Sequence, residues 1–449
     1  MRVTSLYVAL VALVGVALIY YATFRFGTVA SEHVATSYPR PSPLPDTPSS
    51  ESGPSHGWIF DYRKDGRQYG LSDAQCDSAF PRLYKEIDRA VEFRKNNPIT
   101  VDEVETGWRG DGIVRAMIWD NQLYIIEARA VTDHNHRPRA LATMHSIHRA
   151  VSAYPGRLPN VEFTFTTHDS AELAPSEQPS QHTTWSYSRP ANHEKLWLMP
   201  DFGFWGWPDV GLRSYTELQS WLEHQEDEFE DKIPKIIWRG SVHVGSHDVR
   251  AGLLAASEGK EWSDVRSIDW GNETDIEVKL MGMEEHCMYM FTVQTEGNTY
   301  SGRLKYLLNC ASVLVSHPLR FIEHYHHLLD ASPSSPNQNY VQVKRDFSDL
   351  PQKMHHYLSQ KHFEGAKRIA DNARVVFRER YLSPAAEACY WRALIRGWAS
   401  VQGFKTDFWV DGEAGKRKMP RGTPFESYAI MEAVHWNLPA KARKIVEYD

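Results

Sequence analysis

The stretch Met288–His317 constrains the fold of this 449-residue chain more than any other. It begins with a short apolar strand pattern, Met290–Val293, which breaks at a glycine turn, Glu296–Asn298. A helix pattern then starts at Ser301, and a second strand pattern covers Ser312–Val315. A strand, a glycine turn, a helix and a strand form one β-α-β unit, so this stretch predicts two parallel strands joined by a helix.

The start of the predicted helix carries groups that suit a phosphate or diphosphate. Ser301 stands where an N-cap is expected, and Arg303 and Lys305 follow in the first turns. Backbone N–H groups and the helix dipole favour an anion at such a place, and arginine can hold two phosphate oxygens at once. The alternative is an ordinary capped helix whose arginine is a surface charge, because a lone glycine turn is a weak signal.

Strand and helix patterns also alternate on both sides of this unit. Strand Lys235–Arg239 leads into a loop rich in Gly, Ser and His and then a helix from about Asp248. The strand patterns Val265–Ile268 and Tyr340–Val343 follow. Repeated alternation of this kind predicts a parallel, doubly wound sheet. Further helices are expected at 321–329, 348–358, 365–380 and 384–402.

The preceding part of the chain has its own strand and helix patterns. Phe80–Lys95 predicts a helix, and Val114–Trp119 and Leu123–Glu127 predict a hairpin around a two-residue turn. Val161–Thr166 alternates cleanly and predicts a strand, with Asp169 shortly after its end. A carboxylate beyond the C-terminal end of a strand in an open α/β sheet lies where ligands bind.

The N-terminus has the features of a membrane anchor followed by a stem. Leu6–Phe24 contains no charge and is long enough to cross a hydrocarbon core of ~30 Å at ~1.5 Å per residue. Aromatic residues follow it instead of a small-residue cleavage site, which favours an uncleaved signal-anchor. Residues 31–57 are rich in Ser, Pro and Thr and predict an extended spacer.

Charge and cysteine content narrow the class of protein. The net charge of −7 gives no basic surface for a nucleic acid. The four cysteines lack metal-ligand spacing, and Cys287 and Cys310, which flank the β-α-β unit, are one possible disulfide pair. Buried free thiols are the alternative. The sequon at Asn272 would accept a glycan in a secretory compartment.

Several ordered motifs resemble glycosyltransferase family 90. They are TEGNTYSGRLKYLLNCASVLVSH at 295–317, NYVQVKRDFSDLPQ at 339–352, WRGS at 238–241 and AEACYWRALI at 386–395. The resemblance covers roughly residues 60–400. It implies a GT-B-like α/β fold, with two Rossmann-like lobes and a cleft between them.

The same resemblance implies an inverting transfer of a sugar from a UDP-sugar to a hydroxyl of a glycan or protein. Xylose is favoured over glucose as the sugar, although no residue decides between them. It also implies a single-pass type II protein of the Golgi or endoplasmic reticulum membrane with a lumenal catalytic part. The expected divisions are a tip and anchor (1–27), a stem (28–57), an acceptor-side lobe (58–210), a nucleotide-sugar lobe (211–380) and C-terminal helices and tail (381–449).

The resemblance assigns donor contacts to both strand-to-helix connections of the second lobe. Ser301 and Arg303 are expected to contact the diphosphate, and Ser241 and Arg250 to contact the donor. Arg239 is either a further donor contact or a structural group paired with a carboxylate below the site. Glu296, in the turn with Gly297, is either an acceptor for ribose hydroxyls or a helix-capping group.

For the catalytic base the resemblance points to Asp169, and His168 is the alternative because its ordinary pKa of ~6.5 suits proton transfer. The sequence has no Asp-x-Asp motif, so we expect arginines instead of a metal ion on the diphosphate and no cofactor. The histidines His324, His326 and His327 mix helix faces and do not predict a metal site.

Two other functions remain open at this point. A catalytically inactive, membrane-anchored glycan-binding protein would share the fold, because fold does not fix function. A hydrolase would need a second carboxylate about 5–10 Å from Asp169. No motif in the sequence supplies that second carboxylate.

Overall fold

The computed structural model describes residues 57–107, 111–129, 135–169, 183–207, 210–411 and 418–434. The chain divides into the units Met1–Ser55 and His56–Asp449, and every described residue belongs to the second. The predicted anchor and nearly all of the predicted stem lie outside the described residues. No helix among the described residues combines the length and apolar character needed to span a membrane.

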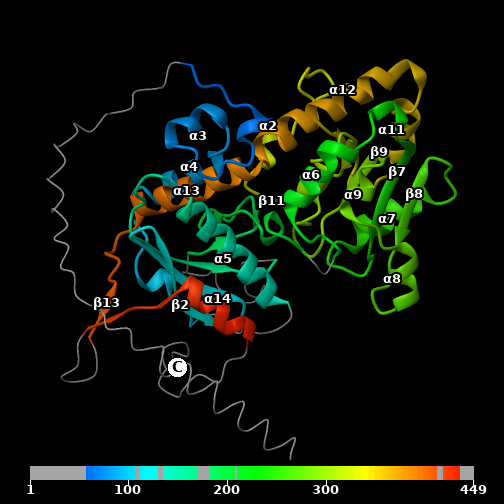
Figure 1. Cartoon of the computed structure of the whole chain (residues 1–449). Coiled ribbons are helices and arrows are strands. Elements are labelled where there is room, and N and C mark those ends of the chain that lie inside the picture. Colours follow the sequence, from blue (N-terminus) through cyan, green and yellow to red (C-terminus); the bar gives the residue numbers. More distant parts are fainter. Residues whose placement is uncertain are drawn as a thin grey trace, which may run out of the picture. The chain divides into compact units, whose positions relative to one another are not determined.

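Five parallel strands form the C-terminal sheet, in the order β12-β10-β9-β7-β8. Figure 1 labels β9, β7 and β8 of this sheet. They are β7 (Ile233–Gly240), β8 (Ser263–Ser267), β9 (Tyr289–Gln294), β10 (Val313–Ser316) and β12 (Val341–Gln342). Numbered along the chain and read from the other edge, this order is 2-1-3-4-5. The order reverses between β7 and β9, and in such a sheet ligands bind outside the carboxyl ends of the strands at this switch point. The predicted parallel, doubly wound sheet is confirmed.

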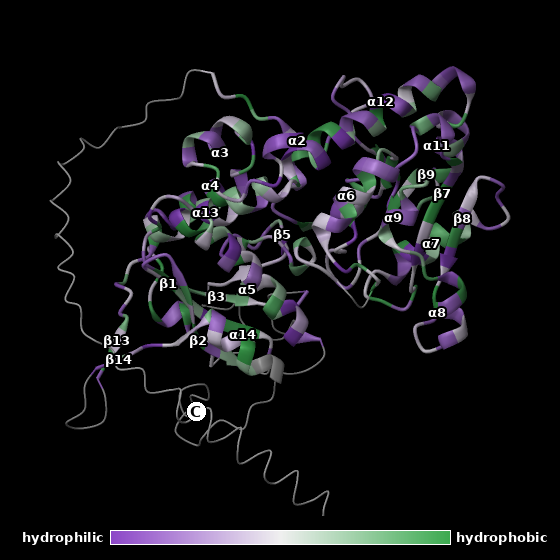
Figure 2. Ribbon diagram, viewed as in Figure 1, coloured by the Kyte–Doolittle hydropathy of each residue, from purple (hydrophilic) through white to green (hydrophobic). Residues whose placement is uncertain are grey.

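The middle of this sheet is buried on both faces. Strands β9 and β10 contain no exposed residue, and Phe291, Val293 and Val315 belong to one apolar cluster with Trp238 of β7. Figure 2 shows the hydrophobic character of β7 and β9. The helices α7 (His247–Ser257), α11 (Leu350–Tyr357) and α12 (Phe363–Ala373) add apolar residues to the same cluster. Burial on both faces is what parallel strands covered by helices require.

The N-terminal sheet has six strands in the order β15-β2-β1-β3-β4-β6. They are β1 (Ile113–Trp119), β2 (Gln122–Arg129), β3 (Val161–Thr166), β4 (Trp185–Ser186), β6 (Trp197–Leu198) and β15 (Thr423–Pro424). β1 pairs antiparallel with both β2 and β3, while β4 pairs parallel with β3 and β6. The predicted hairpin is confirmed, and Asp120 and Asn121 in its turn have φ of 48° and 59°. This sheet is therefore mixed, because the two-residue turn between β1 and β2 can join only antiparallel strands, while β3, β4 and β6 are parallel. The two-lobed GT-B-like arrangement stays a prediction.

Helices surround the N-terminal sheet, and each of the two sheets has one disulfide near it. Its helical neighbours are α4 (Lys85–Arg94), α5 (His136–Ser152), α13 (Pro384–Val401) and α14 (Phe425–Val434), and α3 (Asp73–Ala79) packs against α13. Cys76 of α3 pairs with Cys389 of α13, and their Cα atoms are 5.7 Å apart. Cys287 pairs with Cys310, with Cα atoms 5.0 Å apart, so the disulfide considered from the sequence is present. Trp197, Phe202 and Phe204 belong to the apolar core, and Trp205 and Trp207 pack against it.

Two of the predicted helices differ from the structure. α10 covers only Leu304–Leu307, with Arg303 at its N-cap, so Ser301 lies in the preceding turn and is not the cap. The range 321–329 forms the short strand β11 (Phe321–Ile322) and a 3-10 turn instead of a helix. Strand β11 pairs with β5 (Arg189–Pro190), and the Glu296 carboxylate accepts hydrogen bonds from the N–H groups of Arg320 and Phe321. These contacts hold the backbone out of a helical conformation.

The remaining helices agree with the predictions more closely. The other elements are α2 (Tyr62–Asp65), α6 (Tyr215–Gln225), α8 (Glu273–Lys279), α9 (Met283–His286), a π-helix (Arg374–Tyr381) and the strand pair β13 (Trp409–Val410) and β14 (Met419–Pro420). The predicted helix 365–380 is therefore α12 continued by the π-helix. The helix predicted at 384–402 is α13 to within one residue.

Candidate active site

Two arginines from different helices meet at the switch point of the C-terminal sheet. Arg250 lies in α7, after β7, and donates from Nε to the Glu296 carbonyl (3.0 Å) and from Nη1 to the Ser241 carbonyl (2.6 Å). Arg303, beyond β9, donates from Nη1 to the Arg239 carbonyl (2.6 Å). Each guanidinium is therefore held by backbone carbonyl oxygens at the strand ends.

The indole ring of Trp238 supports both cations. The guanidinium carbons of Arg250 and Arg303 lie 5.7 Å and 5.5 Å from its ring centroid, within the range of a cation–π interaction. A side chain at Gly240 would place its Cβ 3.0 Å from Nη2 of Arg303, so glycine is needed for this approach. Trp238 is fully buried and donates from Nε1 to Thr295 (3.1 Å). The two arginines thus rest on a rigid aromatic base.

No carboxylate of the described residues pairs with Arg250 or Arg303. Burial lowers the pKa of Arg250, and burial together with the neighbouring Arg250 lowers the pKa of Arg303. Both shifts have the sign expected for cations that lack an anionic partner. Two adjacent guanidiniums without a counter-charge form a site that an anion with several oxygens would stabilise.

The other predicted donor residues lie around this arginine pair in different roles. Ser241 follows β7, and its hydroxyl accepts a hydrogen bond from the N–H of His243 (3.0 Å). Ser301 is half-buried in the turn before α10, and Gly297 lies near Arg250, whose Nη2 is 3.6 Å from the position of a Cβ at this glycine. Lys305 points away, because its Nζ pairs with the buried Asp201 at 2.7 Å. The residues predicted to contact the diphosphate are therefore two arginines and nearby loop residues. The short helix α10 itself adds none beyond Arg303 at its N-cap.

Arg239 and Glu296 have structural partners. Arg239 makes a two-oxygen ion pair with Asp264, both contacts at 2.9 Å, so the pairing considered from the sequence is confirmed. The Glu296 side chain is buried, and its second oxygen accepts from Arg345 Nη1 at 3.0 Å. Because both oxygens of Glu296 bind protein groups, the geometry favours a role in shaping the loops over a contact with a ribose. The sequence did not single out Arg345 for this role.

Asp169 lies within hydrogen-bond contact of the turn that precedes α10. The Thr299 hydroxyl donates to the backbone carbonyl of Asp169 at 2.7 Å. The Asp169 carboxylate accepts from Arg139 Nη1 at 2.8 Å and is partly exposed. The end of β3 and the turn after β9 therefore meet, which places the predicted base beside the same loop that leads to Arg303. Arg139 and Thr299 carry no motif that would have identified them from the sequence.

His168, the alternative base, belongs to a separate cluster. Its Nε2 lies 3.3 Å from Asp111 Oδ1, and Nε2 of His136 lies 3.7 Å from the other oxygen, Oδ2, of the same carboxylate. By contrast, His326 binds Glu323, His327 binds the Arg82 carbonyl, and His324 packs against Tyr390. The three histidines that are adjacent in the sequence thus face different partners.

The chain belongs to glycosyl transferase family 90, whose pattern matches residues 73–413 and so includes Asp169 and both arginines. The family is one of glycosyltransferases. Similar characterised proteins are protein O-glucosyltransferase 3 of Homo sapiens, 28% identical over 129 residues, and protein O-glucosyltransferase 2 of Danio rerio, 29% identical over 125 residues. These alignments cover 29% and 28% of this chain but only 24% and 23% of the relatives.

A buried histidine beside the arginines makes stability depend on pH. Burial, with smaller contributions from the charges of Arg303 and Arg239, lowers the pKa of His286 to about 4. In the unfolded chain this histidine takes up a proton near pH 6.5, whereas the folded protein resists protonation until about pH 4. Unfolding therefore binds a proton in this window, and stability falls as the pH falls.

We expect His286 to reduce the free energy of unfolding by about 2 kcal/mol on going from pH 7 to pH 5. Urea unfolding of the wild type and the His286→Gln variant at both pH values measures this contribution. The variant keeps a side-chain hydrogen-bonding group but cannot titrate, so its stability should change less over this range. Equal losses of unfolding free energy in both proteins would show that His286 does not cause the pH dependence.

Proposed function

We propose that this chain is an inverting glycosyltransferase that moves a sugar from a UDP-sugar to a hydroxyl of a glycan or protein. The observation that carries the proposal is the pair Arg250 and Arg303, which lies at the switch point of a doubly wound sheet without a carboxylate partner among the described residues. A diphosphate leaving group offers the charge and the oxygen atoms that this pair lacks. Membership of glycosyl transferase family 90 supports the reaction class.

In the proposed reaction the acceptor oxygen attacks the anomeric carbon from the face opposite the leaving group. Asp169 takes the proton of the attacking hydroxyl, and the bond to the diphosphate oxygen breaks with its electron pair leaving on UDP. Arg250 and Arg303 stabilise the negative charge that develops on the diphosphate. One displacement without a covalent intermediate inverts the anomeric centre. Arg139 holds the Asp169 carboxylate in place through the 2.8 Å contact.

The arrangement of the two lobes, the identity of the donor sugar and the location in the cell are also part of the proposal. A GT-B-like arrangement would place the donor on the C-terminal sheet and the acceptor near Asp169. Xylose remains favoured over glucose as the donor sugar, and the O-glucosyltransferase relatives make glucose the direct competitor. A lumenal location in the Golgi or endoplasmic reticulum, behind the predicted anchor, suits two disulfides and the exposed sequon residue Asn272.

A donor screen tests the proposal directly. The purified chain is mixed with UDP, UDP-xylose, UDP-glucose and other UDP-sugars, and its unfolding temperature and the release of UDP are measured. A nucleotide at a hundred times its Kd stabilises the fold by about 2.7 kcal/mol, so binding should be easily visible. We expect stabilisation by UDP and slow hydrolysis of one or two UDP-sugars. Stabilisation by glycans but by no nucleotide would instead support the glycan-binding alternative.

A further inference from the structure

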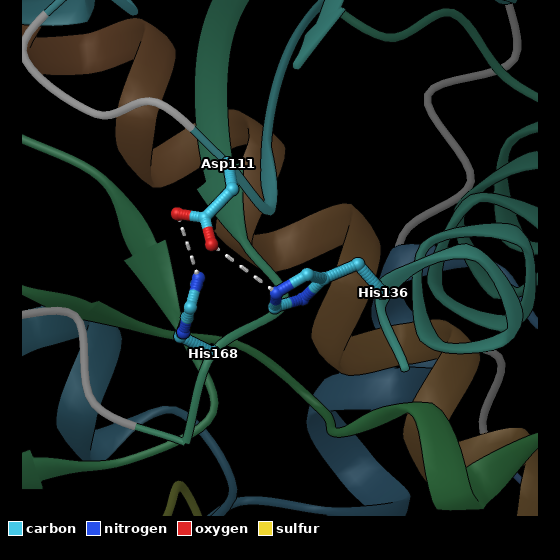
Figure 3. A group of neighbouring side chains, drawn as sticks. All are labelled: Asp111, His136 and His168. Carbon is cyan, nitrogen blue, oxygen red and sulfur yellow. Dashed lines mark ion pairs between the residues drawn. The ribbon is translucent and has the colours of Figure 1, made fainter. Parts of the chain in front are cut away.

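Asp111, His136 and His168 form a cluster outside the arginine site, at the end of the N-terminal sheet. Asp111 precedes β1, His136 is the first residue of α5, and His168 follows β3. One ligand atom from each lies within 4.8 Å of the other two, and this is the one such group of metal-binding side chains in the described part of the chain. Figure 3 shows the Asp111 carboxylate pointing toward both imidazole rings. No spacing motif marks these three positions, which come together only in the folded chain.

We propose that these three side chains bind a divalent transition-metal ion, with zinc as the best match. Two histidines and one carboxylate form a ligand set that zinc accepts, with a water molecule in the fourth position. In a tetrahedral site with ligands about 2.1 Å from the ion, neighbouring ligand atoms lie about 3.4 Å apart. The carboxylate oxygens of Asp111 lie 3.3 Å from Nε2 of His168 and 3.7 Å from Nε2 of His136. The two distances, each to a different oxygen of Asp111, lie on either side of that value.

The surroundings of His136 orient it as a metal ligand. The Thr167 hydroxyl lies 3.1 Å from the Gly112 carbonyl oxygen, which can only accept, so the single hydroxyl proton points there. The hydroxyl oxygen can then accept from Nδ1–H of His136, at 2.8 Å. Nε2, the other ring nitrogen of His136, faces the Asp111 carboxylate at 3.7 Å from Oδ2 and can serve as a metal ligand.

The backbone of Gly112 shapes the same cluster. Its φ of +57° favours glycine, and a Cβ at this position would lie 2.7 Å from the His168 ring and 2.8 Å from the His136 ring. The two ring centroids are 4.2 Å apart. A side chain at residue 112 would therefore displace both imidazoles. The close convergence of these groups depends on the absence of that side chain.

A metal ion here would also position the proposed base, a role that rests on the proposed function. His168 is the residue before Asp169, and His136 lies three residues before Arg139, which binds the Asp169 carboxylate. An ion that joins the two histidines would fix the end of β3 to the start of α5. Arg139 and Asp169 would then be held in one geometry. The ion is distinct from a metal on the diphosphate, which the arginine pair replaces in the proposed reaction.

Metal binding is tested without any assay of sugar transfer. The full chain is stripped with chelator, and Zn²⁺ binding is measured by calorimetry and by metal content after dialysis. Co²⁺ serves as a spectroscopic probe for a tetrahedral site. We expect one ion per chain, and binding more than tenfold weaker in Asp111→Ala and His168→Ala. Asp111 is half exposed, so its removal should leave the fold intact.

Two variants serve as matched controls. His355→Ala and Asp102→Ala remove exposed groups of the same types elsewhere and should bind Zn²⁺ like the wild type. The proposal is overturned if the wild type binds no Zn²⁺, or if Asp111→Ala binds as tightly as the wild type. The positioning role adds a second readout: Asp111→Ala should lower transfer and leave UDP affinity unchanged. If no nucleotide binds, the proposed function is refuted. The Zn²⁺ titration still tests the metal site, because it does not depend on sugar transfer.

Discussion

Replacing Arg303 by alanine is expected to weaken UDP binding by about 3 kcal/mol, or roughly 150-fold, and to reduce transfer at least as much. Arg303 and Arg250 are held by backbone carbonyls and by the face of Trp238 instead of by carboxylates. The diphosphate would be the first strong counter-charge that this pair meets. Removing one guanidinium therefore removes an interaction that exists only when the ligand is bound.

Calorimetric titration with UDP and the UDP-dependent shift of the unfolding temperature measure this effect. Arg303→Lys should lie between the alanine variant and the wild type, because lysine keeps the charge but cannot bind two oxygens in one plane. Arg266→Ala is the matched control, since Arg266 lies on the neighbouring strand β8 and is largely exposed. Without UDP, Arg303→Ala should unfold close to the wild-type temperature. UDP affinity equal to that of the wild type would disprove the role of Arg303 in binding the diphosphate.

Much of the C-terminal sheet could be predicted from the sequence because its strands are buried on both faces. Continuous apolar runs such as Tyr289–Gln294 and Val313–Ser316 are strong local signals, and the intervening glycine turn fixed the β-α-β unit. The strand order could not be predicted from periodicity alone. Helix α10 was predicted to start at Ser301 but starts at Leu304, after a turn in which Thr299 bonds to the carbonyl of Asp169, beyond strand β3. That contact joins residues 130 positions apart and leaves no local pattern.

Contacts between distant segments also decide the roles of the candidate active-site residues, and these contacts leave no local pattern in the sequence. Arg303 could be named because it stands in a motif that resembles the family, and Arg250 because the resemblance assigns it a donor contact; the structure places both near one indole ring. Glu296 also stands in a motif, yet its carboxylate holds the 320–321 backbone and Arg345. The sequence shows which residue types lie near a turn, but it does not show which distant groups their side chains contact. The cluster of Asp111, His136 and His168 escaped prediction for this reason, since its members come from three separate segments.

Asp169→Asn is expected to lower transfer by about 10²- to 10⁴-fold, the usual contribution of a general base, with UDP affinity unchanged. Asparagine has nearly the same shape and keeps an oxygen that can accept from Arg139, so the loop should stay in place. The amide cannot take the acceptor proton at neutral pH. Single-turnover transfer and UDP titration on the same preparation separate the two properties.

Comparing Asp169→Asn with His168→Ala, for both sugar transfer and Zn²⁺ binding, distinguishes a catalytic base from a metal ligand. If Asp169 is the base, Asp169→Asn loses transfer but still binds Zn²⁺, while His168→Ala loses Zn²⁺ and retains part of the transfer. If transfer persists in Asp169→Asn and disappears in His168→Ala, His168 is the base, and Asp111 at 3.3 Å would orient its ring. The two variants thus assign the proton transfer to one of two adjacent residues: His168, a member of the proposed metal site, or Asp169, which contacts the turn that leads to Arg303.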